Sequence, residues 1–163
     1  MTSSKSLARY GLLILFIVIA AISCKKDGAQ LARISEELRG KWNVQSNKMI
    51  YYDESGQKEY EEILERPGDA TEVDFTIGPK ANILSKSDQS ISTTYKLTQE
   101  KKSVYIELHE AEIFDAKKWE ISDVSAGKLT WTANFPNVKY EDKETGEIVE
   151  AYNAELILDL IKQ

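Results

Sequence analysis

The sequence contains one cysteine and one histidine in 163 residues, Cys24 and His109. A single cysteine cannot form an intramolecular disulfide, so a packed core has to hold the fold even in an oxidising compartment. A zinc site built from His and Cys needs several such ligands, which this sequence does not supply. His109 is flanked by Glu107 and Glu110 and follows Leu108 in an alternating segment, so we expect it at the surface.

The sequence also lacks the motifs of the commoner enzyme mechanisms. It has no Gly-rich phosphate loop, no Gly-x-Ser-x-Gly elbow and no Ser/His/Asp set. Paired carboxylates such as Glu61-Glu62 fall in turns or on polar faces, where solvated surface is their expected role. A calcium site near Asp142, Glu144 and Glu147 would need a regular loop spacing that these residues lack. We therefore predict that the protein is not an enzyme and that it holds no metal and no cofactor.

The N-terminal segment has the layout of a secretory signal. Lys5 and Arg9 precede thirteen residues without a charge, residues 10–22, and no acid stands before them. A helix needs about 20 apolar residues to cross a bilayer comfortably, and a run of about 10 to 14 fits a signal better. We therefore predict a cleaved signal peptide over residues 1–23.

The residues at the end of this segment, Ala21-Ile22-Ser23-Cys24, resemble the lipobox of bacterial lipoproteins. The resemblance implies that the thiol of Cys24 carries a diacylglycerol lipid, that the chain is cleaved before Cys24, and that the lipid anchors the protein in a membrane. In some lipoproteins an Asp directly after the cysteine signals retention in the inner membrane. Here Lys25 follows it, so we expect a bacterial cell-envelope protein, in the outer membrane rather than the inner one.

The charge of the chain argues against two kinds of partner. The chain has 21 basic and 27 acidic residues, and cleavage of the signal removes two of the basic ones, Lys5 and Arg9. The remaining chain therefore has 19 basic and 27 acidic residues and a formal charge of −8. Nucleic acid needs clustered Lys and Arg to neutralise its phosphates, so we predict no nucleic-acid partner. The same charge disfavours lying flat on anionic lipid, so the expected membrane contact is the lipid on Cys24.

From residue 41 onward the dominant pattern is the two-residue alternation of half-buried strands. We expect residues 24–35 to form the lipidated cysteine and a flexible tether, residues 36–163 to form one domain, and residues 59–65 to form a short helix or loop. The pattern predicts an all-β fold, an up-and-down antiparallel barrel of eight strands, with a two-sheet sandwich as the alternative. The expected strands are 41–53, 71–77, 81–86, 91–98, 103–109, 117–124, 128–141 and 148–161.

The segment Leu38 to Val44, with Gly40-Lys41-Trp42 at its centre, resembles the opening of lipocalin-like domains. Trp119-Glu120-Ile121 and the segment 127–131 are similar to the sixth and seventh strands of such domains. The resemblance implies a lipocalin-like barrel. Gly40 would let the chain turn tightly, and Trp42 would close the narrow end as an apolar plug. The sequence departs from the family pattern near the last strand, where lipocalins carry an Arg that packs over this Trp and Lys162 is only a distant stand-in.

Aromatic residues supply the candidates for a binding site. Binding pockets are largely apolar, so the first hypothesis is non-catalytic binding of a small apolar or amphipathic ligand inside the barrel. The alternative is a protein-protein interaction module whose barrel is filled by its own side chains, with an apolar patch at residues 60–64. The candidate lining residues are Tyr51, Tyr95, Trp119, Trp131 and Phe135.

Overall fold

The computed structural model describes residues 28–163 except 65–68, 77, 110, 112, 114, 115 and 126. The predicted signal peptide and Cys24 lie outside the described residues. The described part of the chain forms one helix, from residue 28 to residue 38, and nine strands. The strands are β1 (Lys41–Tyr52), β2 (Lys58–Ile63), β3 (Ala70–Asp74), β4 (Lys80–Ser85), β5 (Ser90–Glu100), β6 (Ser103–Leu108), β7 (Lys118–Ser125), β8 (Lys128–Glu141) and β9 (Ile148–Lys162).

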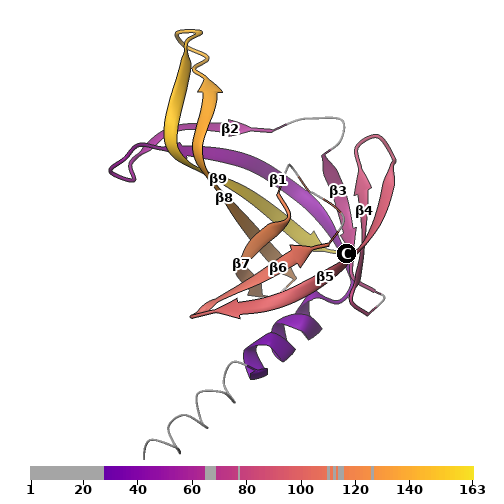
Figure 1. Ribbon diagram of the computed structural model, residues 1–163. Coiled ribbons are helices and arrows are strands. Elements are labelled where there is room, and N and C mark those ends of the chain that lie inside the picture. The colour runs from indigo at the N-terminus through magenta and orange to yellow at the C-terminus, as the bar shows by residue number, and fades with distance from the viewer. Residues whose placement is uncertain are drawn as a thin grey trace, which may run out of the picture.

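Eight of these strands close into an antiparallel barrel (Figure 1). From β3 to β9, each strand pairs with the next one along the chain. Strand β1 completes the ring, because Lys41–Asn43 pair with β3 on one edge and β9 pairs with almost the whole length of the other edge. The predicted eight-stranded barrel is therefore confirmed, the two-sheet sandwich is wrong, and the architecture is consistent with a lipocalin-like domain.

The alternating pattern of the sequence maps onto the two faces of the barrel wall. In β9, Leu156, Leu158 and Leu160 are almost fully buried, whereas Ile157 and Asp159 between them are only half-buried. Side chains alternate between the faces of a strand, so one set of residues fills the barrel and the other faces outward. All eight barrel strands lie where this alternation predicts them, within a few residues at each end.

The prediction of a helix or loop at residues 59–65 is wrong, because this segment contributes most of strand β2. Strand β1 extends beyond the short pairing with β3, and β2 pairs with the exposed edge from Lys48 to Tyr52. Tyr60 lies opposite Tyr51 in this pairing and also stacks on Tyr140 of β8. Ladder hydrogen bonds and ring packing outweigh the helix propensity of the local sequence, which is a weak preference.

The prediction of a flexible tether is also wrong from residue 28 onward, because residues 28–38 are helical. Ile34 and Leu38 on this helix are buried, and the half-buried Leu31 packs against the same core. The spacing 31, 34, 38 places the three side chains along one helix face. The helix therefore packs against one end of the barrel.

Trp42 closes the barrel beside this helix. Its side chain is 1% exposed, and its indole Nε1 donates a hydrogen bond to the Leu38 carbonyl oxygen at 2.7 Å. The Lys162 ammonium lies 5.1 Å from the centroid of the Trp42 ring and donates to the Glu37 carbonyl oxygen at 3.1 Å. Gly40 has φ +120°, and a Cβ added there would lie 2.9 Å from Lys162 Cε. The first and last segments of the domain thus meet at this end.

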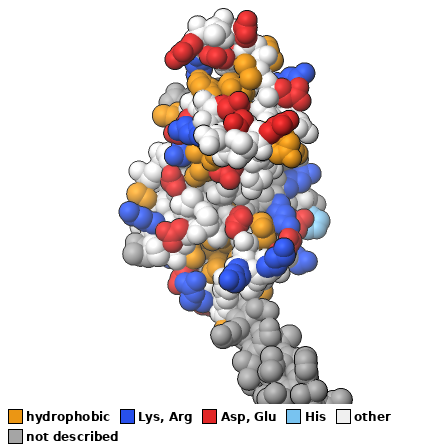
Figure 2. Space-filling view, turned by 90° about the vertical axis from the view of Figure 1, so that its left-hand side faces the viewer, with side chains coloured by type: hydrophobic (Ala, Val, Ile, Leu, Met, Phe, Trp, Pro, Cys, Tyr) orange, Lys and Arg blue, Asp and Glu red, His pale blue; other side chains and the backbone are white. Residues whose placement is uncertain are grey.

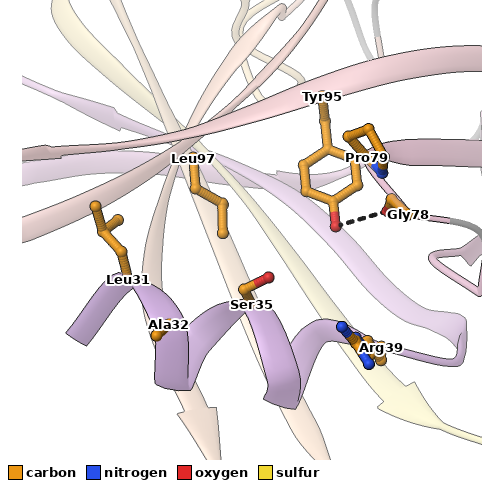
Figure 3. A pocket seen from close by; sticks show the side chains of 8 residues that line it. All are labelled: Leu31, Ala32, Ser35, Arg39, Gly78, Pro79, Tyr95 and Leu97. Carbon is orange, nitrogen blue, oxygen red and sulfur yellow. Dashed lines mark hydrogen bonds between the residues drawn. The ribbon is translucent and has the colours of Figure 1, made fainter. Parts of the chain in front are cut away.

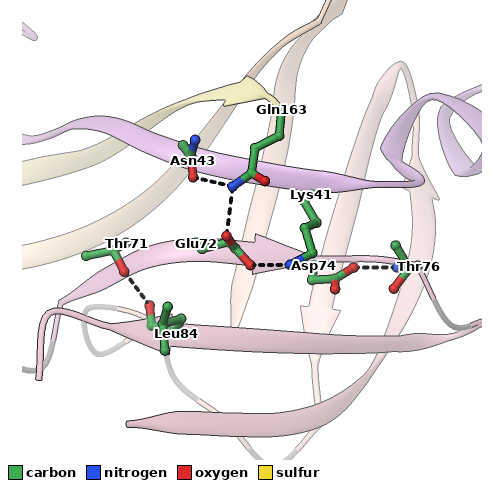
Figure 4. Close-up of polar contacts among 8 residues, drawn as sticks. All are labelled: Lys41, Asn43, Thr71, Glu72, Asp74, Thr76, Leu84 and Gln163. Atoms are coloured by element: carbon green, nitrogen blue, oxygen red, sulfur yellow. Dashed lines mark hydrogen bonds and ion pairs between the residues drawn. The ribbon is translucent and has the colours of Figure 1, made fainter. Parts of the chain in front are cut away.

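Polar side chains connect the strands where β1 lies between β3 and β9 (Figure 4). Gln163 Nε2 donates to Asn43 Oδ1 and to Glu72 Oε2, both at 2.8 Å. Lys41 Nζ lies 3.3 Å from Glu72 Oε1. These contacts tie the C-terminal residue to the outer surface of the barrel.

Candidate functional site

A groove with a volume of about 400 Å³ lies between the N-terminal helix, strand β5 and the turn before β4 (Figure 3). Five of its eight lining residues offer apolar or aromatic side chains, and one residue, Arg39, is charged. The lining residues are Leu31, Ala32, Ser35, Arg39, Gly78, Pro79, Tyr95 and Leu97.

Two regular spacings place these side chains along the groove. Leu31, Ser35 and Arg39 are four residues apart, so one face of the helix and of the residue that follows it carries all three. Tyr95 and Leu97 are two residues apart on β5 and therefore share one face of the strand. Figure 3 shows Leu31 and Leu97 toward one end of the groove, and Tyr95 and Arg39 toward the other. The groove is therefore apolar at one end and polar at the other.

The polar end contains hydrogen-bond donors. Tyr95 Oη is 3.4 Å from the Gly78 carbonyl oxygen, to which it donates a long hydrogen bond. Burial raises the pKa of the Tyr95 hydroxyl, and the nearby Arg39 charge opposes this only in part. The phenol is therefore protonated near neutral pH and can donate. Arg39 Nη2 lies 3.2 Å from Glu36 Oε1 in an ion pair whose side chains are 67% and 66% exposed.

Tyr95 is the one predicted ligand-lining residue that reaches this groove. Its ring meets Phe75 edge-on at 5.1 Å, Phe75 meets Trp131 at 5.9 Å, and Trp131 lies 6.0 Å from Trp119. Trp119 and Trp131 are fully buried, so both belong to the packed interior. Among the described residues, no acceptor bonds the buried Trp131 Nε1. A continuous series of ring contacts thus links the groove to the core.

The structure does not bring the other two candidates to the groove. Tyr51 is 4% exposed, stacks on Tyr140 with ring centroids 4.3 Å apart, and donates to Glu62 Oε1 at 2.6 Å. Phe135 is half-buried and packs against the core cluster. The five predicted residues therefore do not line one common surface.

The sequence reasoning missed the groove residues on the helix, Leu31, Ser35 and Arg39. The sequence pattern predicts a flexible tether over residues 24–35, which includes most of this helix. The apolar spacing 31, 34, 38 was the signal that could have identified the helix.

Two further hollows, of about 500 and 330 Å³, flank the turn between β1 and β2 and share Asp53, Glu54 and Tyr152. At the first hollow, Tyr52 Oη donates to Glu155 Oε2 at 2.8 Å. Burial, this bond and the charges of Glu155 and Glu61 raise the pKa of Tyr52 to about 12. Figure 2 shows acidic side chains gathered at the top of the molecule, where the β8–β9 hairpin ends. This end of the protein is therefore strongly acidic.

Neither metal nor membrane-spanning features are found in the part of the chain that the structure describes. No three or more His, Cys, Asp or Glu side chains in that part are placed to hold a metal ion. Asp142 Oδ1 instead accepts a hydrogen bond from the Glu144 amide within the β8–β9 turn. The described helix is too short and polar to cross a membrane.

Comparison with known proteins gives no match to a family model, a curated protein or a solved structure.

Proposed function

We propose that this protein is a lipid-anchored lipoprotein of the bacterial cell envelope, and that its barrel domain binds a small apolar or amphipathic molecule without catalysis. The observation that carries this proposal is the groove beside the helix, with Leu31 and Leu97 at one end and Arg39 at the other. Its volume of about 400 Å³ falls within the range of roughly 300 to 1,000 Å³ that small-molecule sites occupy.

The packing of the interior supports this groove rather than the centre of the barrel as the ligand site. Trp42, Trp119 and Trp131 are all fully buried, as are Phe75 and most of the inward-facing leucines. An eight-stranded barrel has an interior just wide enough to be filled by such side chains or to hold one small ligand. The half-buried Leu31 and Leu97 remain available to an apolar chain, which gains about 25 cal/mol for each Å² removed from water.

The proposed anchor would hold this groove close to the membrane. Three residues separate Cys24 from residue 28, where the described helix begins. A fully extended chain advances at most about 3.6 Å per residue, so residue 28 lies within about 14 Å of the lipid-bearing cysteine. A ligand leaving the bilayer would therefore meet the helix and the groove first.

Photo-crosslinking of the full-length protein in its own membranes tests the binding proposal. A long-chain fatty acid with a diazirine near the end of its chain is expected to label peptides containing Leu31 and Leu97. Leu97→Gln places an amide at the apolar end of the groove and should reduce this labelling severalfold. The matched control is Ile91→Gln, a change at an exposed apolar residue of the same strand outside the groove. Labelling that is spread evenly over the protein, or that Leu97→Gln leaves unchanged, contradicts the proposal.

The alternative function, a protein-protein interaction module, is favoured by one feature of β2. Ile63 at the end of this strand is 70% exposed, beside the half-buried Leu64. Site-specific crosslinking from position 63 in intact cells should then capture one defined protein, whereas the same crosslinker at Ile91 should not. Equal capture patterns at the two positions contradict this alternative.

A further inference from the structure

We infer that the ligand of the groove is a single-chain amphiphile with an anionic head group, that Arg39 binds this head group, and that Glu36 competes with it for Arg39. The inference rests on the proposed function, since it names the class of molecule that the groove would bind. It is carried by the charge, the donors and the length of the groove.

The charge of the groove differs from that of the whole chain. The protein has 27 acidic and 21 basic residues, yet Arg39 is the one charged side chain among the described lining residues. A carboxylate would be repelled by most of the surface, but no acid of the described chain lines this groove. The sign of the lining charge therefore favours an anion.

Two polar lining groups at the Arg39 end can donate hydrogen bonds to a ligand. The guanidinium presents donors in a planar fork and has no acceptor, and the Ser35 hydroxyl can donate one hydrogen bond, whereas the Tyr95 phenol already donates to the Gly78 carbonyl oxygen at 3.4 Å. A carboxylate is a pure acceptor and pairs with a guanidinium through short, charge-assisted bonds. A neutral alcohol head group would satisfy fewer of these donors.

The length of the groove fits one extended chain. Leu31 and Arg39 are eight residues apart, which corresponds to about 12 Å along a helix. Leu97 lies across the groove from the Leu31 end (Figure 3), so apolar side chains flank that end from both sides. A molecule with its anionic group at Arg39 would place its apolar chain between Leu31 and Leu97.

Glu36 occupies part of the hydrogen-bonding capacity of Arg39 in the structure. The two side chains form an ion pair at 3.2 Å, and both are about two-thirds exposed. Exposed pairs of this kind are weak and exchange readily with solvent. An anionic head group that is also held by its chain would displace Glu36, which swings into water. Glu36 therefore sets how much of the Arg39 charge the ligand can use.

The helix offers a matched control for Arg39. Arg33 lies on the helix that Arg39 follows and is 57% exposed, and its Nη1 donates to both carboxylate oxygens of Glu37, at 2.8 and 2.9 Å. Arg33 does not line the groove. Arg33→Gln and Arg39→Gln thus remove the same charge within one short stretch of the chain, at one position away from the groove and at one position in it.

The test compares two photoreactive probes of equal chain length, a carboxylic acid and the corresponding alcohol, on the full-length protein in its membranes. The concentration that half-saturates labelling of the groove peptides is measured for each probe. We expect Arg39→Gln to raise this concentration about tenfold for the acid and to leave it unchanged for the alcohol. Glu36→Gln should lower it about threefold for the acid, and Arg33→Gln should change neither value.

The outcomes separate this inference from the function on which it rests. If both probes label the groove equally and Arg39→Gln affects neither, the groove binds apolar chains without recognising an anion, and the inference is overturned while the proposed function stands. If neither probe labels the groove, the inference and the proposed function fail together. An equal effect of Arg33→Gln and Arg39→Gln on the acid would show a general charge effect and would also overturn the inference.

Discussion

At the residue scale, Gly40 shows how one backbone conformation supports the closed end of the barrel. Residues other than glycine rarely adopt its φ of +120°. A Cβ added at this position would also lie 2.9 Å from Lys162 Cε. Lys162 can move, but it then leaves the Trp42 ring and the Glu37 carbonyl. Backbone strain and the displaced lysine therefore act together at this position.

We expect Gly40→Ala to lower the free energy of unfolding by about 1 to 3 kcal/mol, measured by urea unfolding followed through tryptophan fluorescence. The matched control is Gly56→Ala, where φ is +77° but nothing lies within 4 Å of the added Cβ. Gly56→Ala should cost less, because it carries the backbone strain without the contact. Equal losses at the two glycines would show that the contact with Lys162 contributes nothing.

A second residue-scale prediction concerns Tyr52 and alkaline pH. The pKa of Tyr52 is raised to about 12 in the folded protein from its ordinary value of 10.0, chiefly by burial and by the hydrogen bond to Glu155. The folded state therefore keeps the proton that the unfolded chain releases. This contribution to stability is fully present below pH 10 and is lost as the pH rises from 10 to about 12.

Urea unfolding at several pH values between 10 and 12 tests this prediction. The wild type should lose stability more steeply over this window than Tyr52→Phe, which has no phenol to ionise. Glu155→Gln removes one charge and weakens the hydrogen bond, so it should give an intermediate slope. Identical slopes for all three proteins would contradict the assignment of the shift to this pair.

Residue-scale reasoning from sequence found Tyr95 but could not place the candidates together. Aromatic type alone does not distinguish a residue in the core, such as Trp131, from one that reaches a groove, such as Tyr95. That difference depends on which residues of a strand face the helix, and the properties of a single residue do not contain this information.

At the element scale, the two wrong predictions have different physical causes. Strand β2 has a helix-forming sequence, but it pairs with the edge of β1, and its Tyr60 stacks on Tyr140 of β8, which is far away in the chain. Local propensity cannot anticipate such a partner. The helix at residues 28–38 was missed although its apolar spacing of 31, 34 and 38 stands in the sequence. The signal for this helix is local, but the polar residues around the three apolar ones favour a flexible segment.

The dependence of β2 on ring packing gives an element-scale prediction. Tyr140 stacks on both Tyr51 and Tyr60, with centroids 4.3 and 5.2 Å apart. Aromatic pairs contribute about 0.5 to 1.5 kcal/mol each, so Tyr140→Ser should speed amide exchange in β2 by about tenfold. Exchange in β5 and β6 should stay unchanged, because these strands lie elsewhere in the barrel.

The measurement is hydrogen-deuterium exchange with peptide-level mass spectrometry. Tyr152→Ser, at a tyrosine of β9 that is 59% exposed, is the matched control and should leave β2 protected. Faster exchange across the whole barrel in Tyr140→Ser would mean that the ring cluster supports the entire fold rather than this strand.

At the scale of the whole molecule, the barrel could be predicted because its eight strands are antiparallel neighbours that repeat one sequence pattern. The two-residue alternation recurs along the chain from residue 41, so small errors at strand ends do not change the count of strands. The position of the helix against one end, and with it the groove, could not be predicted in this way. It depends on a single short segment whose neighbours lie in the turn before β4, on β5 and on β9.

The anchoring proposal also belongs to this scale, because it decides which end of the molecule faces a membrane. If Cys24 carries the lipid, Cys24→Ser should lose all labelling by radioactive palmitate in a Gram-negative host and should retain residues 1–23, since the cleavage implied by the lipobox resemblance lies before the lipidated cysteine. Intact-mass spectrometry distinguishes the two forms. Ser23→Ala keeps a small residue before the cysteine and should remain labelled and cleaved. A labelled Cys24→Ser protein would place the lipid elsewhere, and the helix beside the groove would lose its proposed position next to the bilayer.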